Sequence, residues 1–189
     1  RLSYVGTNWY NLGVTFAKFQ IDQHKAKGLT TGKIAILSPI QAQNMQEARQ
    51  GMKDTLAGTG IEVVAEEDNE SNASVAAQKT AAILAANKDL TGIAGLDSES
   101  PPGIVAALDE AGKSGELIVT VNEAGPEFLQ NIKDGKVQLI CMEKYDVMEY
   151  MALSMLYAWH NDAIRPAGID PWKSNWMPDK IDSGLILVT

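Results

Sequence analysis

Four amide or carboxylate side chains follow short apolar runs along this chain: Asn44, Asp97, Asn122 and Glu143. If those runs are strands of one parallel sheet, their carboxyl ends share the edge at which open α/β sheets bind ligands. Amides and carboxylates that face one crevice form paired hydrogen bonds with vicinal hydroxyls, and Trp9 offers an apolar face for a sugar ring. The alternative interpretation is a set of solvated loop residues, because strand ends are polar in every α/β protein. Both interpretations stay open at this point.

No recognisable catalytic motif accompanies these side chains. The chain lacks G-x-S-x-G, P-loop, H-E-x-x-H and C-x-x-C patterns, so we expect no catalytic residue, no cofactor and no metal ligand. Of the two histidines, His24 is expected on a helix surface and His160 at a helix end. Glu66, Glu67 and Asp68 resemble the acids of a receiver-like enzyme, but the order of the other groups that such a site needs is missing. We interpret them as a solvated acidic turn.

The composition excludes several classes of partner. The net charge of −8 argues against nucleic-acid binding, which depends on Lys and Arg neutralising phosphates. No uninterrupted apolar run approaches the ~20 residues of a membrane span, so no membrane insertion is expected. Cys141 is the only cysteine, which rules out an intramolecular disulfide, and we expect it to be buried and inert. With 45% hydrophobic residues the chain can bury a substantial core.

The elements that would position the polar groups are clearest between residues 116 and 145. Residues 117–121 form a short, β-branched apolar run, and Pro126 suits the first turn of the helix that follows. Asp134 and Gly135 end that helix, and residues 137–142 form the next strand. Two apolar strands joined through a helix must run parallel.

The same alternation extends over most of the chain. Strands are expected at 2–5, 33–37, 61–65, 91–96, 117–121, 137–142 and 185–188, and the helices between them at 8–27, 42–57, 74–87, 103–110 and 126–134. Alternation of this kind predicts an α/β fold with a doubly wound parallel sheet and right-handed crossovers. A further helix, 146–161, is apolar around much of its circumference, which implies burial on more than one side.

Five segments in register resemble a known family, the type I periplasmic binding proteins of the ribose-binding type. They are GTNWYNLG (6–13), GKIAILSPIQAQNMQEARQGM (32–52), LTGIAGLDSESPPGIVAALDEAG (90–112), LIVTVNEAGPEFLQNIKDGKVQLICMEKYDVM (117–148) and MPDKIDSGLILVT (177–189). The resemblance implies two Rossmann-like lobes joined by three crossing segments. It also implies a small polar ligand that is trapped between the lobes by hinge closure.

The resemblance further implies that this chain is the carboxyl-terminal portion, with most of the amino-terminal lobe absent. Residues 1–8 would end that lobe and form the first crossover, and residues 9–143 would be the carboxyl-terminal ligand-binding lobe. Residues 144–161 would be a helix that normally packs on the amino-terminal lobe. Residues 162–189 would be the return crossover and last strand. The chain also starts without Met, as a fragment or processed chain would.

Ligand-binding positions carry over from the family one by one. Asn122 stands where the family has its ligand-binding Asp, Glu143 stands at the Gln of the hinge strand, and Asp97 matches the Asn. Asn8 with Trp9 replaces an Asp-Asn pair.

The ligand-binding arginine of the family falls on Ala48, and this chain has Arg49 one place later. One residue along a helix is a rotation of about 100°, so Arg49 points away from the direction of the family's arginine. The predicted ligand residues are therefore Asn8, Trp9, Asn44, Arg49, Asp97, Asn122 and Glu143.

The function implied by the resemblance is that of a solute-binding component of an ABC-type importer, periplasmic or otherwise extracytoplasmic and non-catalytic. Its partners would be a carbohydrate or similar small polar ligand and the transporter permease. A sensor or a repressor effector domain shares this fold and remains an alternative. A small flavodoxin-like or receiver-like enzyme is the alternative from another class. Without its usual lobe, the helix at 146–161 is expected to pair two copies of the chain through Met148, Met151, Met155 and Trp159.

Overall fold

The computed structural model describes residues 3–122, 125–161 and 178–189. The chain divides into two compact units. Unit 1 comprises Arg1–Asn8 and Glu143–Ile186, and unit 2 comprises Trp9–Met142 and Leu187–Thr189. Among the described helices, none is both long and apolar enough to cross a membrane.

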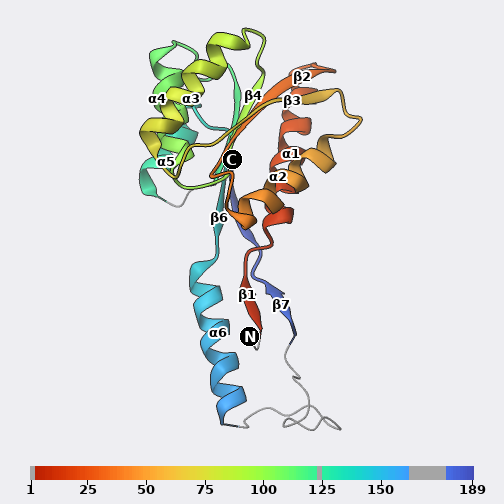
Figure 1. Cartoon of the computed structure of the whole chain (residues 1–189), viewed down its shortest axis with the longest axis vertical. Helices are drawn as coiled ribbons and strands as arrows, with labels where there is room; N and C mark the ends of the chain where they lie inside the picture. Colours follow the sequence, from red (N-terminus) through yellow and green to blue (C-terminus); the bar gives the residue numbers. More distant parts are fainter. Residues whose placement is uncertain (1–2, 123–124, 162–177) are drawn as a thin grey trace. The chain divides into compact units, whose positions relative to one another are not determined.

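Unit 2 is built on a twisted, mostly parallel sheet (Figure 1). The strands of this sheet are β2 (Gly32–Leu37), β3 (Ile61–Glu67), β4 (Gly92–Gly95), β5 (Ile118–Asn122), β6 (Leu139–Glu143) and β8 (Leu185–Val188). Glu143 of β6 and the first two residues of β8 belong to unit 1. Their order is β3-β2-β4-β5-β6-β8, and the pairs from β3 to β6 all run parallel. The predicted doubly wound α/β fold is thereby confirmed. The chain order reverses at β2, so the switch point, where such sheets bind ligands, lies between the carboxyl ends of β2 and β4.

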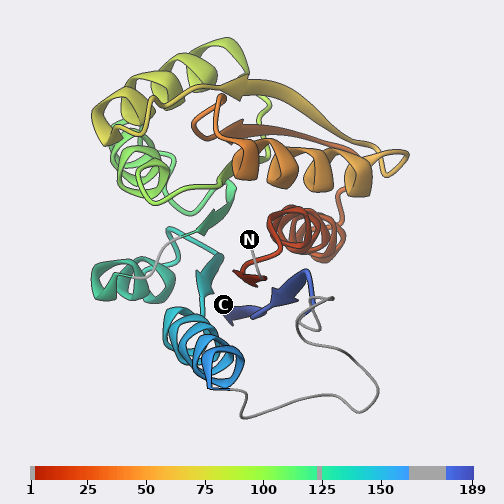
Figure 2. The same cartoon turned by 60° about the horizontal axis from the view of Figure 1, so that its bottom comes forward.

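Helices cover both faces of this sheet, as Figures 1 and 2 show. The helices of unit 2 are α1 (Trp9–Ala26), α2 (Gln43–Leu56), α3 (Ala73–Ala86), α4 (Ser100–Glu110) and α5 (Pro126–Lys133). In both views α1 and α2 lie together on one face, and α3 and α4 lie together on the other. Alternate residues of β2 serve the two faces: Ala35 and Leu37 belong to the core cluster under α3 and α4, whereas Ile34 and Ile36 point the opposite way.

Several helix ends follow from the local sequence. The Asn72 side chain caps α3 by accepting hydrogen bonds from the N–H groups of Ser74 and Val75. Helix α4 begins at Ser100, earlier than the predicted residue 103, because Pro101 and the proline after it fit the first helical turn, where no N–H donor is needed. Gly135 follows α5 with φ of 71°, a left-handed conformation that favours glycine.

The helix pairs on each face cross through glycines that let their backbones touch. A Cβ atom on Gly13 of α1 would lie 1.8 Å from the carbonyl oxygen of Ala48 in α2, and one on Gly51 would lie 2.1 Å from the carbonyl oxygen of Tyr10. On the other face, a Cβ atom on Gly103 of α4 would lie 2.5 Å from the carbonyl oxygen of Ala73 in α3. Any side chain at these glycines would therefore push the helices apart.

The prediction that His24 lies on a helix surface is wrong. Leu12, Phe16, Gln20 and His24 repeat every four residues on α1, and all four are buried. The His24 ring lies with Nδ1 2.7 Å from the Gln20 carbonyl oxygen and Nε2 2.8 Å from Thr91 Oγ1. Its polar atoms are satisfied on the side of the sheet where β2 and β4 begin, away from the carboxyl edge.

Unit 1 contains a two-stranded parallel sheet and one long helix. Strand β1 (Tyr4–Gly6) pairs with β7 (Lys180–Asp182), and α6 (Tyr145–His160) follows β6. Residues 162–180 are rich in Pro, Asp and Trp, which predicts a loop. Strand β7 was therefore missed, because its three residues have mostly exposed side chains and show no apolar run. Residues 162–177 of the predicted loop at 162–180 lie outside the described residues.

An ion pair in unit 2 gives a testable pH dependence. Lys136 Nζ lies 2.6 Å from Asp109 Oδ2, and together with a hydrogen bond from Ser114 it holds the pKa of the Asp109 carboxyl below its ordinary value. This stabilisation is present above the unfolded-state pKa of about 3.9 and is lost as the pH falls through the folded-state pKa.

We therefore expect Lys136→Ala to lower the free energy of unfolding at pH 7 by less than about 1 kcal/mol, because the pair is partly exposed. Urea denaturation of both proteins from pH 7 to about pH 3 should show this difference shrinking below about pH 4. A difference that stayed constant over this range would show that the variant acts through something other than Asp109.

Candidate ligand-binding site

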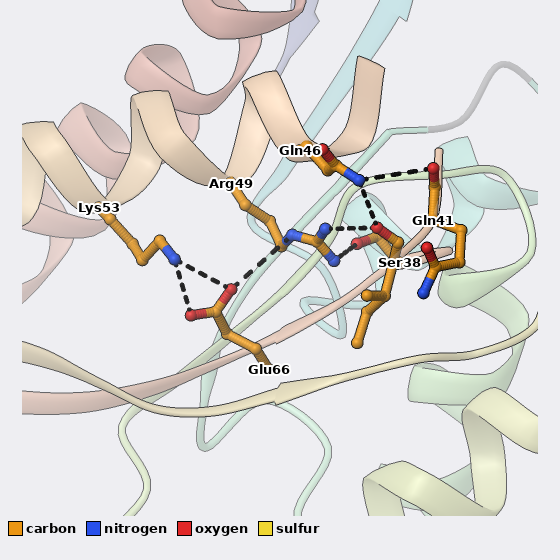
Figure 3. Close-up of polar contacts among 7 residues, drawn as sticks. Ser38, Gln41, Gln46, Arg49, Lys53 and Glu66 are labelled. Atoms are coloured by element: carbon orange, nitrogen blue, oxygen red, sulfur yellow. Dashed lines mark hydrogen bonds and ion pairs between the residues drawn. The ribbon is translucent and has the colours of Figure 1, made fainter. Parts of the chain in front are cut away.

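The carboxyl edge of the sheet in unit 2 carries two connected polar networks. The first is centred on Arg49 of α2, whose side chain is only 9% exposed (Figure 3). Its Nη1 donates to Ser38 Oγ at 3.2 Å, and its Nη2 donates to the Ile40 carbonyl oxygen at 2.8 Å. Its Nε lies 3.8 Å from Glu66 Oε2. Arg49 thus joins the loop after β2 to strand β3.

Two further side chains support the Arg49 network. Gln46 Nε2 donates to the same Ile40 carbonyl oxygen at 3.2 Å and lies 3.5 Å from the Gln41 carbonyl oxygen. Lys53 Nζ lies 3.0 Å from Glu66 Oε1, so Glu66 is held by two cations (Figure 3). The loop at 38–41 is therefore fixed by α2 along most of its length.

The second network is centred on Asp97, in the loop between β4 and α4. Asn69 Nδ2, in the loop after β3, lies 2.9 Å from each Asp97 carboxylate oxygen and 2.9 Å from Ser100 Oγ. Ser100 Oγ lies 2.5 Å from Asp97 Oδ1 and 3.2 Å from the Leu37 carbonyl oxygen, and the Glu99 N–H donates to Asp97 Oδ2 at 3.2 Å. Asn69 and Ser100 are fully buried, and Asp97 is nearly so.

The two networks meet at the end of β2. Leu37 accepts a hydrogen bond in the Asp97 network, and the next residue, Ser38, accepts one in the Arg49 network. Because β2 and β4 flank the switch point of the sheet, the networks lie where this fold places its ligand.

The other predicted residues of unit 2 are more loosely grouped. Asn122 is the last residue of β5 and is 5% exposed, at the same carboxyl edge. Asn44 was expected at or just beyond a strand end, but it is the second residue of α2 and is half-buried. Trp9, the first residue of α1, is also half-buried. Both therefore lie on the first turns of two helices that pack against each other.

Asn8 and Glu143 belong to unit 1, whereas the other predicted ligand residues belong to unit 2. Asn8 is exposed, and its backbone N–H donates to Asp182 Oδ1 at 3.3 Å. Glu143 ends β6 and accepts a hydrogen bond from the Tyr145 hydroxyl at 3.1 Å. A ligand contact that combines residues of both units stays a prediction.

Sequence reasoning missed Asn69, Ser100 and Ser38. Asn69 stands two residues after the end of β3, just as Asp97 stands two residues after the end of β4. The position after the strand was thus the available signal, and it was overlooked because the turn at 66–72 is rich in acids and amides. Two of those acids form ion pairs, Glu66 with Lys53 and Glu67 with Lys79. No group of His, Cys, Asp or Glu within the described ranges is arranged to hold a metal ion.

The chain matches a family described as a periplasmic binding protein domain over residues 1–161. Similar solved structures include AraP, an arabinose-binding protein from Geobacillus stearothermophilus, with 24% identity and a TM-score of 0.88. That match covers 100% of this chain and 63% of AraP. An ABC transporter solute-binding protein from Burkholderia graminis, solved with D-arabinose, is 27% identical with a TM-score of 0.83, covering 100% of this chain and 62% of that one.

A third similar structure is an ABC transporter solute-binding protein from Agrobacterium vitis with bound D-fucose, 24% identical with a TM-score of 0.82. The match covers 99% of this chain and 60% of the Agrobacterium vitis protein. A search of curated proteins finds no match. The chain thus spans less than two thirds of the structures it resembles.

The relatives are binding proteins of transporters and not enzymes, in agreement with the absence of catalytic motifs. The family match covers most of the sequence, and the structural matches span the whole chain. The chain therefore belongs to the periplasmic binding protein family, and its fold is that of the sugar-binding proteins of ABC transporters.

Proposed function

We propose that this chain is the sugar-binding part of a solute-binding component of an ABC-type importer, acting outside the cytoplasm with a transporter permease as its partner. The observation that carries the proposal is the 27% identity, over the whole chain, to a solute-binding protein solved with D-arabinose. Unit 2 would be the carboxyl-terminal ligand-binding lobe, corresponding to residues 9–143. Residues 1–8 would end the amino-terminal lobe and form the first crossover, and residues 144–161 would be a helix that normally packs on that lobe. Residues 162–189 would be the return crossover and last strand. Closure would shift the population of open and closed forms by contacts from both lobes.

The chemistry of the carboxyl edge supports a polyhydroxylated ligand. Asn122 presents an amide at the end of β5, and Trp9 and Asn44 stand on the first turns of neighbouring helices. Amide groups serve a hydroxyl both as donor and as acceptor, and an indole ring packs on the apolar face of a sugar. Asn8 and Glu143 would contribute from unit 1. Arg49 and Asp97 are engaged by protein groups, so their contribution would come through the loops they hold.

A sugar panel tests the proposal. Pentoses and hexoses, including D-arabinose, D-fucose and D-tagatose, would be added to the folded chain at millimolar concentration, and the melting temperature and binding heat measured. A sugar present at 100 times its Kd stabilises the folded state by about 2.7 kcal/mol, which is a readily measured shift. Amino acids serve as the negative control. A folded protein that responds to no sugar in either measurement would overturn the proposal.

Asn122 gives the sharpest site variant. Asn122→Leu keeps the number of side-chain heavy atoms and removes the amide, so we expect sugar affinity to fall by about 10- to 100-fold, as for losing hydrogen bonds in a buried site. Isothermal titration with the best sugar of the panel measures the effect. Thr120→Val is the matched control, because Thr120 is buried on the same strand, two residues before Asn122. Equal losses in both variants would argue against a ligand contact at Asn122.

Self-association through α6 also stays a prediction, but the most exposed apolar side chains of α6 are not the ones that were predicted to form the contact. Met148, Met151 and Met155 are half-buried and Trp159 is 42% exposed, whereas Tyr150, Leu153 and Tyr157 are 74%, 68% and 67% exposed. Sedimentation velocity at high protein concentration should show a dimer that Leu153→Glu converts to monomer, because a charge at a buried contact is costly. Ser154→Glu, at an exposed polar position of the same helix, is the control. A wild-type chain that stays monomeric would rule the dimer out.

A further inference from the structure

We propose that Asn69 and Asp97 form a positioning pair that holds the loops of the carboxyl edge in place, and that the Asp97 carboxylate serves this scaffold instead of the ligand. The pair is a deeply buried polar contact between the loops after β3 and β4, since Asn69 is 0% and Asp97 8% exposed. Only the part of the inference that concerns a ligand rests on the proposed function.

Three protein groups approach the Asp97 carboxylate as donors: the Asn69 amide, the Ser100 hydroxyl and the Glu99 N–H. An ionised carboxylate offers about four acceptor sites on its two oxygens. Oδ1 is approached by Asn69 Nδ2 and Ser100 Oγ, and Oδ2 by Asn69 Nδ2 and the Glu99 N–H. A ligand hydroxyl would compete with these donors for the two carboxylate oxygens. Of the ion pairs formed among the described residues, none includes Asp97, and its charge is stabilised by hydrogen bonds from these donors.

Asn69 also fixes a strained loop. Glu70 and Ser71 have φ values of 54° and 51°, so two consecutive residues with side chains adopt the left-handed conformation. Such backbone persists only where the surroundings hold it. Asn69 Oδ1 accepts a hydrogen bond from the Ser71 N–H at 3.1 Å, while Asn69 Nδ2 reaches Asp97. One amide thus ties the strained turn after β3 to the loop after β4.

Ser100 extends the connection to the switch point. Its hydroxyl contacts Asn69, Asp97 and the Leu37 carbonyl oxygen at the end of β2. The segments after β2, β3 and β4 are therefore linked through one buried group of side chains. A site held in this way loses little conformational entropy on binding.

Hydrogen exchange in variants that swap the amide donor and the carboxylate acceptor tests whether Asn69 and Asp97 hold the loops. In Asp97→Asn, the NH₂ group of the new amide faces the Asn69 NH₂ group in either orientation, because Asn69 Nδ2 lies 2.9 Å from both Asp97 oxygens. In Asn69→Asp, two carboxylates face each other. We expect backbone amides in 66–76 and 95–103 to exchange at least about tenfold faster in each single variant, with α1 as the internal reference. The double variant Asn69→Asp/Asp97→Asn restores a donor facing an acceptor and should regain most of the protection.

Matched controls separate the loss of the Asn69–Asp97 contact from the general effect of changing an amide to a carboxylate or the reverse. Asn72→Asp keeps the cap of α3, and Asp68→Asn keeps the acceptor for the Glu70 N–H, so both should leave exchange unchanged. Ser100→Ala is the milder variant should a single variant fail to fold. Unchanged loop exchange in both single variants, or a double variant worse than either, would overturn the pair.

The sugar titration decides the role of the carboxylate. If Asp97 serves the scaffold, the double variant regains sugar affinity together with loop protection. If Asp97 contacts the ligand directly, protection returns and affinity does not, which would overturn that part of the inference. If the wild-type chain binds no sugar of the panel, the proposed function fails, while the exchange experiment still decides whether the pair holds the loops.

Discussion

Gly13→Ala is expected to destabilise unit 2 by more than about 3 kcal/mol, a cost typical of severe overpacking in a core. The added methyl group would lie 1.8 Å from the Ala48 carbonyl oxygen and 2.8 Å from the Met52 nitrogen, so the backbones of α1 and α2 would have to separate. Separation would open the contacts that bury Leu12 and Phe16 on this face of the sheet. Urea denaturation followed by far-UV circular dichroism measures the loss.

Gly112→Ala is the control for this experiment. Unlike Gly13, Gly112 has φ of 64° and no atom within 4 Å of an added Cβ. Its replacement should cost only about 1 kcal/mol, the price of a left-handed residue. Gly51→Ala should resemble Gly13→Ala, because its Cβ would lie 2.1 Å from the Tyr10 carbonyl oxygen. A Gly13→Ala variant as stable as Gly112→Ala would contradict the close helix crossing.

Arg49→Met is expected to lower the free energy of unfolding by about 2–4 kcal/mol, because charge-assisted hydrogen bonds in a buried site are lost. The guanidinium bridges Ser38, the Ile40 carbonyl oxygen and Glu66, and methionine fills the space without reaching any of them (Figure 3). Arg49→Lys should recover little of this stability, because a single ammonium group cannot reach the three partners that the planar guanidinium contacts. Urea denaturation gives the stability, and hydrogen exchange of residues 38–42 shows whether the loop loosens.

Lys53→Met provides the comparison for Arg49. Lys53 pairs with the same Glu66, but its side chain is 42% exposed, so its loss should cost less than about 1 kcal/mol. If Arg49→Met cost no more than Lys53→Met, the buried network would not be the main reason for the stability of this loop.

The sequence predicted which residues lie at the carboxyl edge of the sheet better than it predicted their hydrogen-bond partners. Apolar runs and glycine or proline boundaries located β2 to β6, and the parallel order followed from the helices between them. Asp97 and Asn122 were placed correctly at this edge for the same reason. Asn69 was overlooked although it occupies the equivalent position after β3, because its neighbours are polar and the buried contact is 28 positions away along the chain.

Amphipathic periodicity also failed where a polar residue lies on the buried face. Gln20 and His24 continue the stripe of Leu12 and Phe16 on α1. Gln20 Nε2 donates to the Ile118 carbonyl oxygen, and His24 Nε2 lies 2.8 Å from Thr91 Oγ1. A single sequence does not show such partners, so His24 was assigned to the surface. Strand β7 was missed for a related reason, since its register comes from pairing with β1 and not from an apolar pattern.

By itself, the sequence determined the α/β class, the edge at which a ligand would bind and the family to which the chain belongs. These depend on local patterns: hydrophobic periodicity, breaker residues and polar residues after strands. Only the tertiary structure decided that Arg49 and Asp97 contact protein groups, that Asn69 and Ser100 join them, and that Gly13 and Gly51 let two helices touch. These depend on hydrogen-bond directions and contact distances between segments far apart in the chain, which residue types and spacing do not specify.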